Sequence, residues 1–407
     1  MRTRTPCVAA ALICLISPAA AQTVLSEDDA LARLSVDSPR VRAIRAAVDV
    51  ARVDIVAAGR WPNPRATFNR EAVAGVTENM FLVTQALPIT GRRGLDISAA
   101  STLVSASERR ADDEVRRARA ALRSAFADLV SAQVRETELA RARDRLRDLT
   151  DILARREAAG EAAGYDRLRA DREVMDVAAE WAVARSDRAR AQAGLAAFFA
   201  APGDVTTIVA VAPDASTKPV LPSVDELMAH AESVLGEPAA LRDEMASAEF
   251  AERAAVRRFL PEPEVVLGTK SSTLAGGDLG SVLSVHVNVP LFDRARPERA
   301  LAQARRAQAG AKATAFQVSL RAQVTALRSV VMERREAADR YRASAAASAG
   351  QLERIAQVSY EAGEHGILEL LDAYRSAGAA RTRQAVLDAA ARQAEIELEL
   401  VSGWETR

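Results

Sequence analysis

The sequence repeats itself at an interval of about half its length. Three landmarks recur in the same order, displaced by 199, 202 and 203 residues: Pro62 as Pro261, Pro88 as Pro290, and Gly160 as Gly363. Solenoid repeats are only about 20–50 residues long, so this interval indicates duplication of a whole supersecondary unit. Duplication on this scale is common in membrane transport proteins. We therefore expect a first repeat at 22–203, a linker at 204–222 and a second repeat at 223–407.

Each repeat contains one long stretch that favours an uninterrupted helix. Leu95–Ala159 has neither glycine nor proline, and Glu298–Ala362 has no proline and only two glycines, Gly310 and Gly350. In the first stretch apolar residues recur at intervals of three, four and seven, which is typical of one narrow coiled-coil-like stripe. We place these helices at about 92–160 and 297–362, and at 1.5 Å per residue each is a rod of about 100 Å.

Two shorter helical stretches accompany each long one. Their summed lengths nearly match the long rod in both repeats, so each repeat can pair one continuous helix with one helix broken in the middle. A chance agreement among unrelated helices is the alternative. The four short stretches are Ser26–Ala58 and Tyr165–Ala200 in the first repeat, and Val224–Arg258 and Ile367–Ser402 in the second.

The first 21 residues read as a secretory signal peptide. Arg2 and Arg4 precede an apolar run that is shorter than the roughly 20 residues of a membrane span, and small residues then offer a cleavage site after Ala21. Both cysteines, Cys7 and Cys14, lie in this segment, and a lipid anchor on Cys14 is the weaker reading. The mature chain then has no disulfide or thiolate metal site. The formal net charge of +0 does not attract nucleic acid.

A segment of different periodicity lies before each long helix. Leu283, Val285 and Val287 alternate with polar residues, as expected for a strand with one apolar face, and we place hairpins at about 65–88 and 263–290. In the first hairpin the segment Met80–Leu87 alternates poorly. Four strands cannot close a barrel, since known barrels begin at roughly eight. Three copies would supply twelve strands, whereas a small soluble hairpin resting on helices is the alternative. The expected fold class is mainly α with a small β part.

Five runs of the chain form a pattern: Phe81–Pro88 with Gly91-Arg92-Arg93, Ala196–Phe199, Val287–Arg294, Tyr360–Gly363 with Leu370–Ala373, and Leu398–Gly403. In this order they resemble TolC-like outer-membrane efflux proteins, and most closely the outer-membrane components of heavy-metal efflux systems of the CzcC type. The resemblance implies a homotrimer with a twelve-stranded barrel in outer-membrane lipid and a helical tunnel across the periplasm. It also implies a periplasmic adaptor (membrane fusion) protein and an inner-membrane pump as partners, and no enzymatic activity. The chain departs from the family at Ala295-Arg296-Pro297, where relatives often place Asn-Gly.

The resemblance also implies where a channel gate would lie. Acidic residues just after the second helix turn fall on Glu369 and Asp372, which share a helix face because they are three residues apart. In a trimer they would form two carboxylate rings that attract cations. Ordinary solvated helix charges are the alternative. Tyr360 and His365 could bond across the closed mouth, although His365 in a turn is more simply an exposed residue. Asp166, with Asp171 behind it, occupies the related region of the first repeat.

Four glycines flank the two helix-to-helix turns, where we expect positive φ angles: Gly160, Gly164, Gly363 and Gly366. These turns are the expected docking surface for an adaptor's helical hairpin, and turn geometry alone is the alternative.

No cofactor, metal site or catalytic site is expected. The three histidines are far apart in the sequence, and no metal-binding or phosphate-loop motif is present. The function expected is a passive outer-membrane exit duct of a tripartite pump, with heavy-metal cations or small toxic compounds as cargo. The alternatives are the outer component of type I protein secretion, and a soluble periplasmic coiled-coil scaffold or adaptor.

Overall fold

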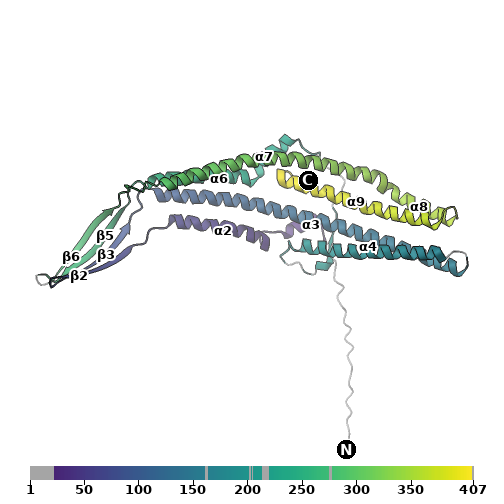
Figure 1. Ribbon diagram of the computed structural model, residues 1–407, viewed down its shortest axis with the longest axis horizontal. Helices are drawn as coiled ribbons and strands as arrows, with labels where there is room; N and C mark the ends of the chain where they lie inside the picture. The colour runs from purple at the N-terminus through teal and green to yellow at the C-terminus, as the bar shows by residue number, and fades with distance from the viewer. Residues whose placement is uncertain are drawn as a thin grey trace, which may run out of the picture. The chain divides into compact units, whose positions relative to one another are not determined.

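The computed structural model describes residues 23–160, 164–200, 203, 205–212, 220–274 and 277–405. The expected signal peptide, with Cys7 and Cys14, lies outside these ranges. The described chain is mainly α with a small β part, as predicted (Figure 1). Within the same ranges, no helix combines the length and the apolar character needed to cross a membrane.

The chain forms two compact units, and they do not coincide with the two sequence repeats. Unit 1 comprises the described residues of Met1–Arg33 and Ala125–Asp214, and unit 2 those of Leu34–Ser124 and Ala215–Arg407. The helix α3 (Arg92–Ala158) contributes to both, because the boundary falls within it. The duplication is a property of sequence order, whereas the units reflect packing.

Unit 1 contains a small sheet that the sequence did not predict. The strands β1 (Thr23–Leu25) and β4 (Ile208–Ala210) pair in parallel, and β4 follows the short 3₁₀ helix η1 (Val205–Thr207). The side chain of Gln133 donates to the Ala210 carbonyl (2.7 Å) and accepts from its N–H (2.9 Å). The predicted linker at 204–222 is therefore partly wrong, because three of its residues form a strand. The helices of unit 1 are α1 (Glu27–Arg33), the second part of α3, and α4 (Gly164–Ala196).

Unit 2 is built from helices that pack along their lengths. In it α6 packs against α7, and α7 and α8 pack against α9. Leu227, Leu320, Val324 and Leu398 are among the buried residues that join α5, α7 and α9. The helices are α2 (Pro39–Gly59), the first part of α3, α5 (Val224–Val234), α6 (Gly236–Arg257), α7 (Arg296–Tyr341), α8 (Ala347–Glu361) and α9 (Ile367–Ser402).

The helix predicted at Ser26–Ala58 is interrupted. The interruption falls between α1 and α2, where the Ser38 hydroxyl accepts a hydrogen bond from the Val41 N–H (3.3 Å) and Pro39 occupies the first helical position. A serine cap followed by proline is a strong start signal, because proline has no N–H to leave unpaired there. The prediction of one continuous helix was therefore wrong.

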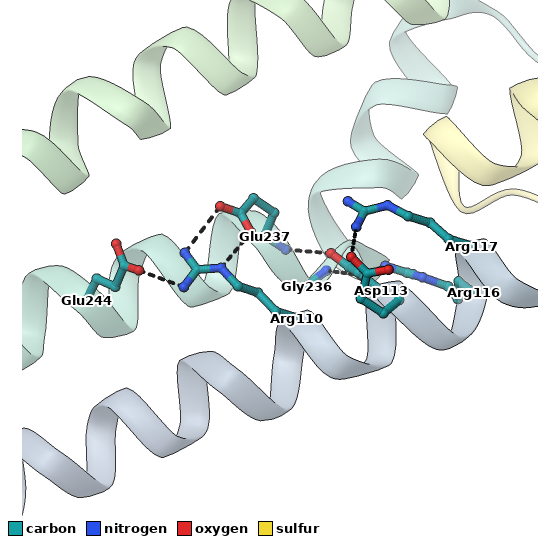
Figure 2. A network of polar contacts seen from close by, with 8 residues as sticks. Arg110, Asp113, Arg116, Arg117, Gly236, Glu237 and Glu244 are labelled. Carbon is teal, nitrogen blue, oxygen red and sulfur yellow. Dashed lines mark hydrogen bonds and ion pairs between the residues drawn. The ribbon is translucent and has the colours of Figure 1, made fainter. Parts of the chain in front are cut away.

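The helix predicted at Val224–Arg258 is also broken, at Leu235, which is extended (φ −69°, ψ 135°). Pro238 has no N–H to donate to the Val234 carbonyl, so the helix cannot continue through this turn. The carboxylate of Asp113 accepts hydrogen bonds from the backbone N–H groups of Gly236 (2.8 Å) and Glu237 (2.9 Å) (Figure 2). A side chain on α3 thus caps the start of α6.

An ion-pair network fixes α3 against α6 beside this cap. The guanidinium of Arg110 donates to Glu237 (2.9 Å) and Glu244 (2.6 Å), two turns apart on α6 (Figure 2). A Cβ on Gly236 would lie 2.2 Å from the Arg109 carbonyl oxygen, so only glycine permits this approach of the two backbones.

The second long helix is continuous but not uniform. A π-helical turn, η3 (Arg342–Ala346), separates α7 from α8, which corrects the prediction of a regular helix over Glu298–Ala362. Arg342 pairs with Asp339 (2.7 Å) within the helix and with Asp388 on α9. No side chain of the turn is buried, so the wider turn displaces no core residue.

One antiparallel sheet of unit 2 unites both predicted hairpins. Its strands are β2 (Arg65–Val73), β3 (Val76–Ala86), β5 (Pro263–Ser272) and β6 (Asp278–Val287), in the order β2-β3-β5-β6. The strand predicted at Met80–Leu87 begins earlier, because Ala74 and Gly75 have positive φ angles (53° and 83°) and form a tight turn. The hairpin predicted at about 263–290 is present, since β5 and β6 pair from Pro263 with Val287 to Ser272 with Asp278.

The two faces of this sheet differ in chemistry. Phe68, Leu267, Leu283 and Val285 are more than half exposed and belong to one face, given the alternation and register of the strands. The opposite face carries polar groups, including the ion pair between Lys270 and Glu78 (2.6 Å). The sheet therefore presents an uncovered apolar face and leaves β2 and β6 as open edges in the described chain.

Candidate gate, helix turns and strand-to-helix junctions

The turn between α8 and α9 is a tightly bonded helix cap. Gly363 has φ 74°, and its N–H donates to the Tyr360 carbonyl (3.0 Å), while the Glu364 N–H donates to the Ser359 carbonyl (2.8 Å). These two bonds and the left-handed glycine make up a Schellman motif. Gly366 then caps α9 with an extended backbone (φ −83°).

Glu369 and Asp372 lie on the exposed face of α9, directly after this turn. Ile367, Leu370 and Leu371 are buried on the opposite side of the helix. The two carboxylates thus share one solvent-facing stripe, which the proposed rings require. Whether copies bring them together is a question of assembly, so their role as a gate stays a proposal.

The two carboxylates differ in their local surroundings. Glu369 is in the first turn of α9, and its Oε2 lies 3.1 Å from where a Cβ on Gly366 would be. A carboxylate over a helix N-terminus interacts favourably with the helix dipole, so Glu369 has a stabilising role of its own. Asp372 has no hydrogen-bond or ion-pair partner among the described residues.

The other gate candidates of unit 2 contribute mainly to the turn itself. Tyr360 is half-buried, and its carbonyl accepts from Gly363. His365 is exposed, and its backbone N–H donates to the Ser359 carbonyl (3.3 Å).

The first turn, in unit 1, is capped in a related way. Gly160 has φ 77°, and its N–H donates to the Glu157 carbonyl (2.9 Å). Residues 161–163 lie outside the described ranges. Asp166 is half-buried in the first turn of α4, beside an ion pair between Arg167 and Glu157 (2.6 Å).

The expectation of four positive φ angles was half right. Gly160 and Gly363 have them, because each follows the last turn of a helix, where a left-handed residue closes the cap. Gly164 and Gly366 do not, because each stands at the start of the next helix, where the backbone is helical or extended.

Two further segments lead from the sheet into the long helices. We call residues 87–94 the first junction and residues 289–296 the second junction. Each begins with the same turn: the Ile89 N–H donates to the Leu87 carbonyl across Pro88, and the Leu291 N–H donates to the Val289 carbonyl across Pro290, both at 2.9 Å.

The first junction is bonded to its surroundings. The Thr90 hydroxyl donates to Glu262 (2.7 Å), and its carbonyl accepts from Arg257 (2.7 Å). Arg93 donates to the Gly59 carbonyl (2.7 Å) and lies over the ring of Trp61, 5.6 Å from its centroid. Arg92 lies 3.7 Å from the Glu262 carboxylate.

The second junction is exposed. The side chain of Phe292 is 98% exposed, and Leu291 is 63% exposed. Arg294 and Arg296 are exposed and have no hydrogen-bond or ion-pair partner in the part of the chain that the structure describes. In the sequence, the run through Phe292 and Arg294 indicates only a family resemblance. Its exposure was not anticipated.

No cluster of three or more histidine, cysteine, aspartate or glutamate residues suited to a metal ion occurs among the described residues. The arrangement offers charged helix faces and an apolar sheet face instead of a site for bound metal.

The fold is similar to that of known outer-membrane proteins over nearly its whole length. A membrane protein from Pseudomonas aeruginosa is 19% identical, with a TM-score of 0.76, over 93% of each chain. The outer membrane protein VceC from Vibrio cholerae is 15% identical, with a TM-score of 0.71, over 94% of this chain and 97% of its own. The open state of the Neisseria gonorrhoeae MtrE outer membrane channel is 16% identical, with a TM-score of 0.71, over 94% of this chain and 90% of its own.

A scan of protein-family models gives no match to this chain, and neither does a search of curated protein sequences. The relationship is therefore visible in the fold and not in overall sequence identity. The chain has the fold of these outer-membrane channel proteins, which is the fold that its resemblance to TolC-like proteins implied.

Proposed function

We propose that this protein is an outer-membrane channel, the passive exit duct of a tripartite efflux system. The observation that carries the proposal is the uncovered apolar face of the four-stranded sheet, in a chain that is helical almost everywhere else. An uncovered apolar sheet face would promote aggregation in water, whereas in lipid it is the ordinary outer surface of a barrel.

The open sheet edges support assembly from several copies. Unpaired backbone groups on β2 and β6 are costly in lipid, and pairing β6 of one copy with β2 of the next removes them. Three copies would close a barrel of twelve strands, within the range of known sizes. The full-length similarity to outer-membrane channels supports the same arrangement.

The helices would then form the tunnel, and the turns its periplasmic end. Glu369 and Asp372 of three copies would form two acidic rings at the mouth, with Tyr360 and His365 as further candidates in the same turn. Asp166 is the corresponding candidate of the first turn. Acidic rings favour cationic cargo, such as heavy-metal ions or cationic toxic compounds. The turns at Gly160–Gly164 and Gly363–Gly366 would contact the adaptor protein, which would link the duct to an inner-membrane pump.

Conductance across a planar lipid bilayer tests this function. The purified protein should form discrete, cation-selective channels, and Glu369→Ala/Asp372→Ala should raise conductance and weaken cation selectivity because both rings lose their charge. Asp372→Asn should give the same change in part. It removes only the charge, whereas replacing Glu369 also disturbs the start of α9.

A matched control lies on the same helix. Glu397 is exposed on α9 and has no partner among the described residues. It lies 28 residues from Glu369, about 42 Å along the helix axis. Glu397→Gln should leave conductance unchanged. A protein that forms no channels and stays soluble without detergent would contradict the proposal, while channels insensitive to both carboxylates would contradict only the gate.

A further inference from the structure

We propose that the second junction, residues 289–296, binds the headgroup of an anionic phospholipid at the rim of the sheet. The proposal rests on the proposed function, since it requires the apolar sheet face to lie in a membrane. The ligand chemistry is a phosphodiester at a lipid surface, held by Arg294 and Arg296 with Phe292 beside it.

The comparison with the first junction shows that the second is built for something outside the chain. Both junctions begin with the same proline turn, but α3 starts at Arg92 and α7 at Arg296. Measured from Pro88 and Pro290, the second junction is two residues longer. Phe292, two residues after Pro290, is 98% exposed, whereas Thr90, two residues after Pro88, is half-buried and bonded.

The side chains change from apolar to basic along the second junction. Val285 (60% exposed), Val287 (51%) and Val289 (61%) continue the apolar face of β6 past the end of the strand. Phe292 follows, then Asp293, whose carboxylate accepts a hydrogen bond from the Ala295 N–H (3.1 Å), and then Arg294 and Arg296. A chain that passes from lipid hydrocarbon through the interface to the headgroups typically carries apolar residues first, then an aromatic ring, and then arginines.

The arginines are free for such a ligand. Arg92 and Arg93 of the first junction have partners within the chain, whereas Arg294 and Arg296 have none among the described residues. A guanidinium presents paired N–H donors that match phosphate oxygens, and each arginine near an anionic membrane surface strengthens binding.

The positive charges that a neighbouring copy would bring make it an unfavourable ligand for the second junction. When β6 of one copy meets β2 of the next, the second junction approaches the segment before β2, where Arg60 and Arg65 are exposed. Neither has an ion-pair partner in the described ranges. Placing these arginines together is unfavourable unless an anion lies between them, and a lipid phosphate supplies that anion.

Native mass spectrometry of the full chain tests the proposal. The protein, purified in a neutral detergent, would be titrated with phosphatidylglycerol or with phosphatidylcholine of equal chain length. The wild type should retain phosphatidylglycerol selectively. Arg294→Gln/Arg296→Gln should weaken its binding by about 30-fold, given the contribution of two arginines at a membrane surface. Phosphatidylcholine binding should not change.

Controls separate this site from general charge. Arg354 and Arg383 are exposed on α8 and α9 and have no partner among the described residues, so Arg354→Gln/Arg383→Gln removes equal charge elsewhere. This variant should bind phosphatidylglycerol like the wild type. Equal losses of phosphatidylglycerol binding in both double variants, or no loss in either, would overturn the proposal. A junction variant that dissociates the assembly with lipid selectivity intact would also overturn it, in favour of a contact between copies.

The proposed function can fail separately. If the protein needs no detergent and forms no channels, flotation with vesicles of phosphatidylglycerol or phosphatidylcholine replaces the titration. Binding to anionic vesicles that depends on Arg294 and Arg296 would then retain the headgroup site without the channel. Binding to neither kind of vesicle would contradict both the headgroup site and the channel function.

Discussion

The two strand-to-helix junctions begin alike and end differently. Both leave the sheet through a hydrogen bond across a proline, and both enter a long helix after a residue with positive φ, Gly91 (70°) in the first and Ala295 (52°) in the second. The first junction is then bonded to Glu262, Gly59 and Arg257. The second leaves an aromatic ring and two guanidinium groups exposed.

The difference shows how a duplicated unit can divide its tasks. In the first repeat the junction holds the sheet to the helices, because its polar groups are satisfied within the chain. In the second repeat the same backbone turn is kept, but two added residues withdraw it from those contacts. Internal bonding stabilises the fold, whereas exposed side chains are available to a membrane or a partner.

The largest expected effect on the free energy of unfolding comes from changing the residues with positive φ, Gly91 and Ala295. Gly91→Ala should lower the free energy of unfolding by about 1–2 kcal/mol, because a side chain is strained at this φ. The new Cβ would also lie 2.3 Å from Arg257 Nη1 and would displace its hydrogen bond to Thr90. Ala295→Gly should stay within about 0.5 kcal/mol of wild type, since relief of strain is offset by greater freedom of the unfolded chain.

Urea denaturation in a neutral detergent, followed by circular dichroism, measures both variants. A loss at Ala295→Gly as large as at Gly91→Ala would contradict the comparison. It would mean that the buried methyl group of Ala295 matters more than the backbone angle.

The next largest effect on the free energy of unfolding is expected from one arginine of each junction, Arg93 of the first and Arg294 of the second. Arg93→Gln should lower the free energy of unfolding by about 1 kcal/mol, because it removes the hydrogen bond to Gly59 and the contact with Trp61. Arg294→Gln should stay within about 0.5 kcal/mol of wild type in neutral detergent, since the arginine has no partner among the described residues. The same denaturation experiment measures both, and equal losses would show that Arg294 is held by the fold.

Much of this fold could be predicted from the sequence, because its signals are local. Freedom from glycine and proline over some 60 residues predicts a long helix, and α9 has the predicted bounds, Ile367–Ser402. The interruptions at Pro39 and Pro238 also had local signals. The matched helix lengths do not reveal these interruptions, since a broken helix of the same total length fits equally well.

Other features had weak signals or none. The π-helical turn at Arg342–Ala346 has no sequence signature, and the strands β1 and β4 are three residues each. The gate residues could be placed on a helix face, but a ring depends on copies that no single chain contains. The second junction did have a signal. The predicted helix starts, 92 and 297, are 205 residues apart, whereas Pro88 and Pro290 are 202 apart.

The smallest expected effect is a pH dependence at Asp96, on α3 just after the first junction. Asp96 lies in a hollow of about 250 Å³ lined also by Arg92, Arg258 and Glu298. Burial raises the pKa of the Asp96 carboxyl above its ordinary value of 3.8, although Arg92 and Arg258 oppose the rise. The unfolded chain therefore releases this proton more readily, and ionisation costs stability as the pH rises above 3.8.

Asp96→Asn removes that cost, so it should stabilise the protein at neutral pH by less than about 1 kcal/mol, a small value because the group is partly exposed. The gain should disappear at pH values below 3.8, where the carboxyl is protonated in both states. Asp293→Asn is the matched variant at the second junction, because its amide oxygen can still accept from the Ala295 N–H. Denaturation at several pH values measures both. A gain at Asp96 that persists in acid, or a loss at neutral pH, would mean that packing and not charge sets the contribution of Asp96 to stability.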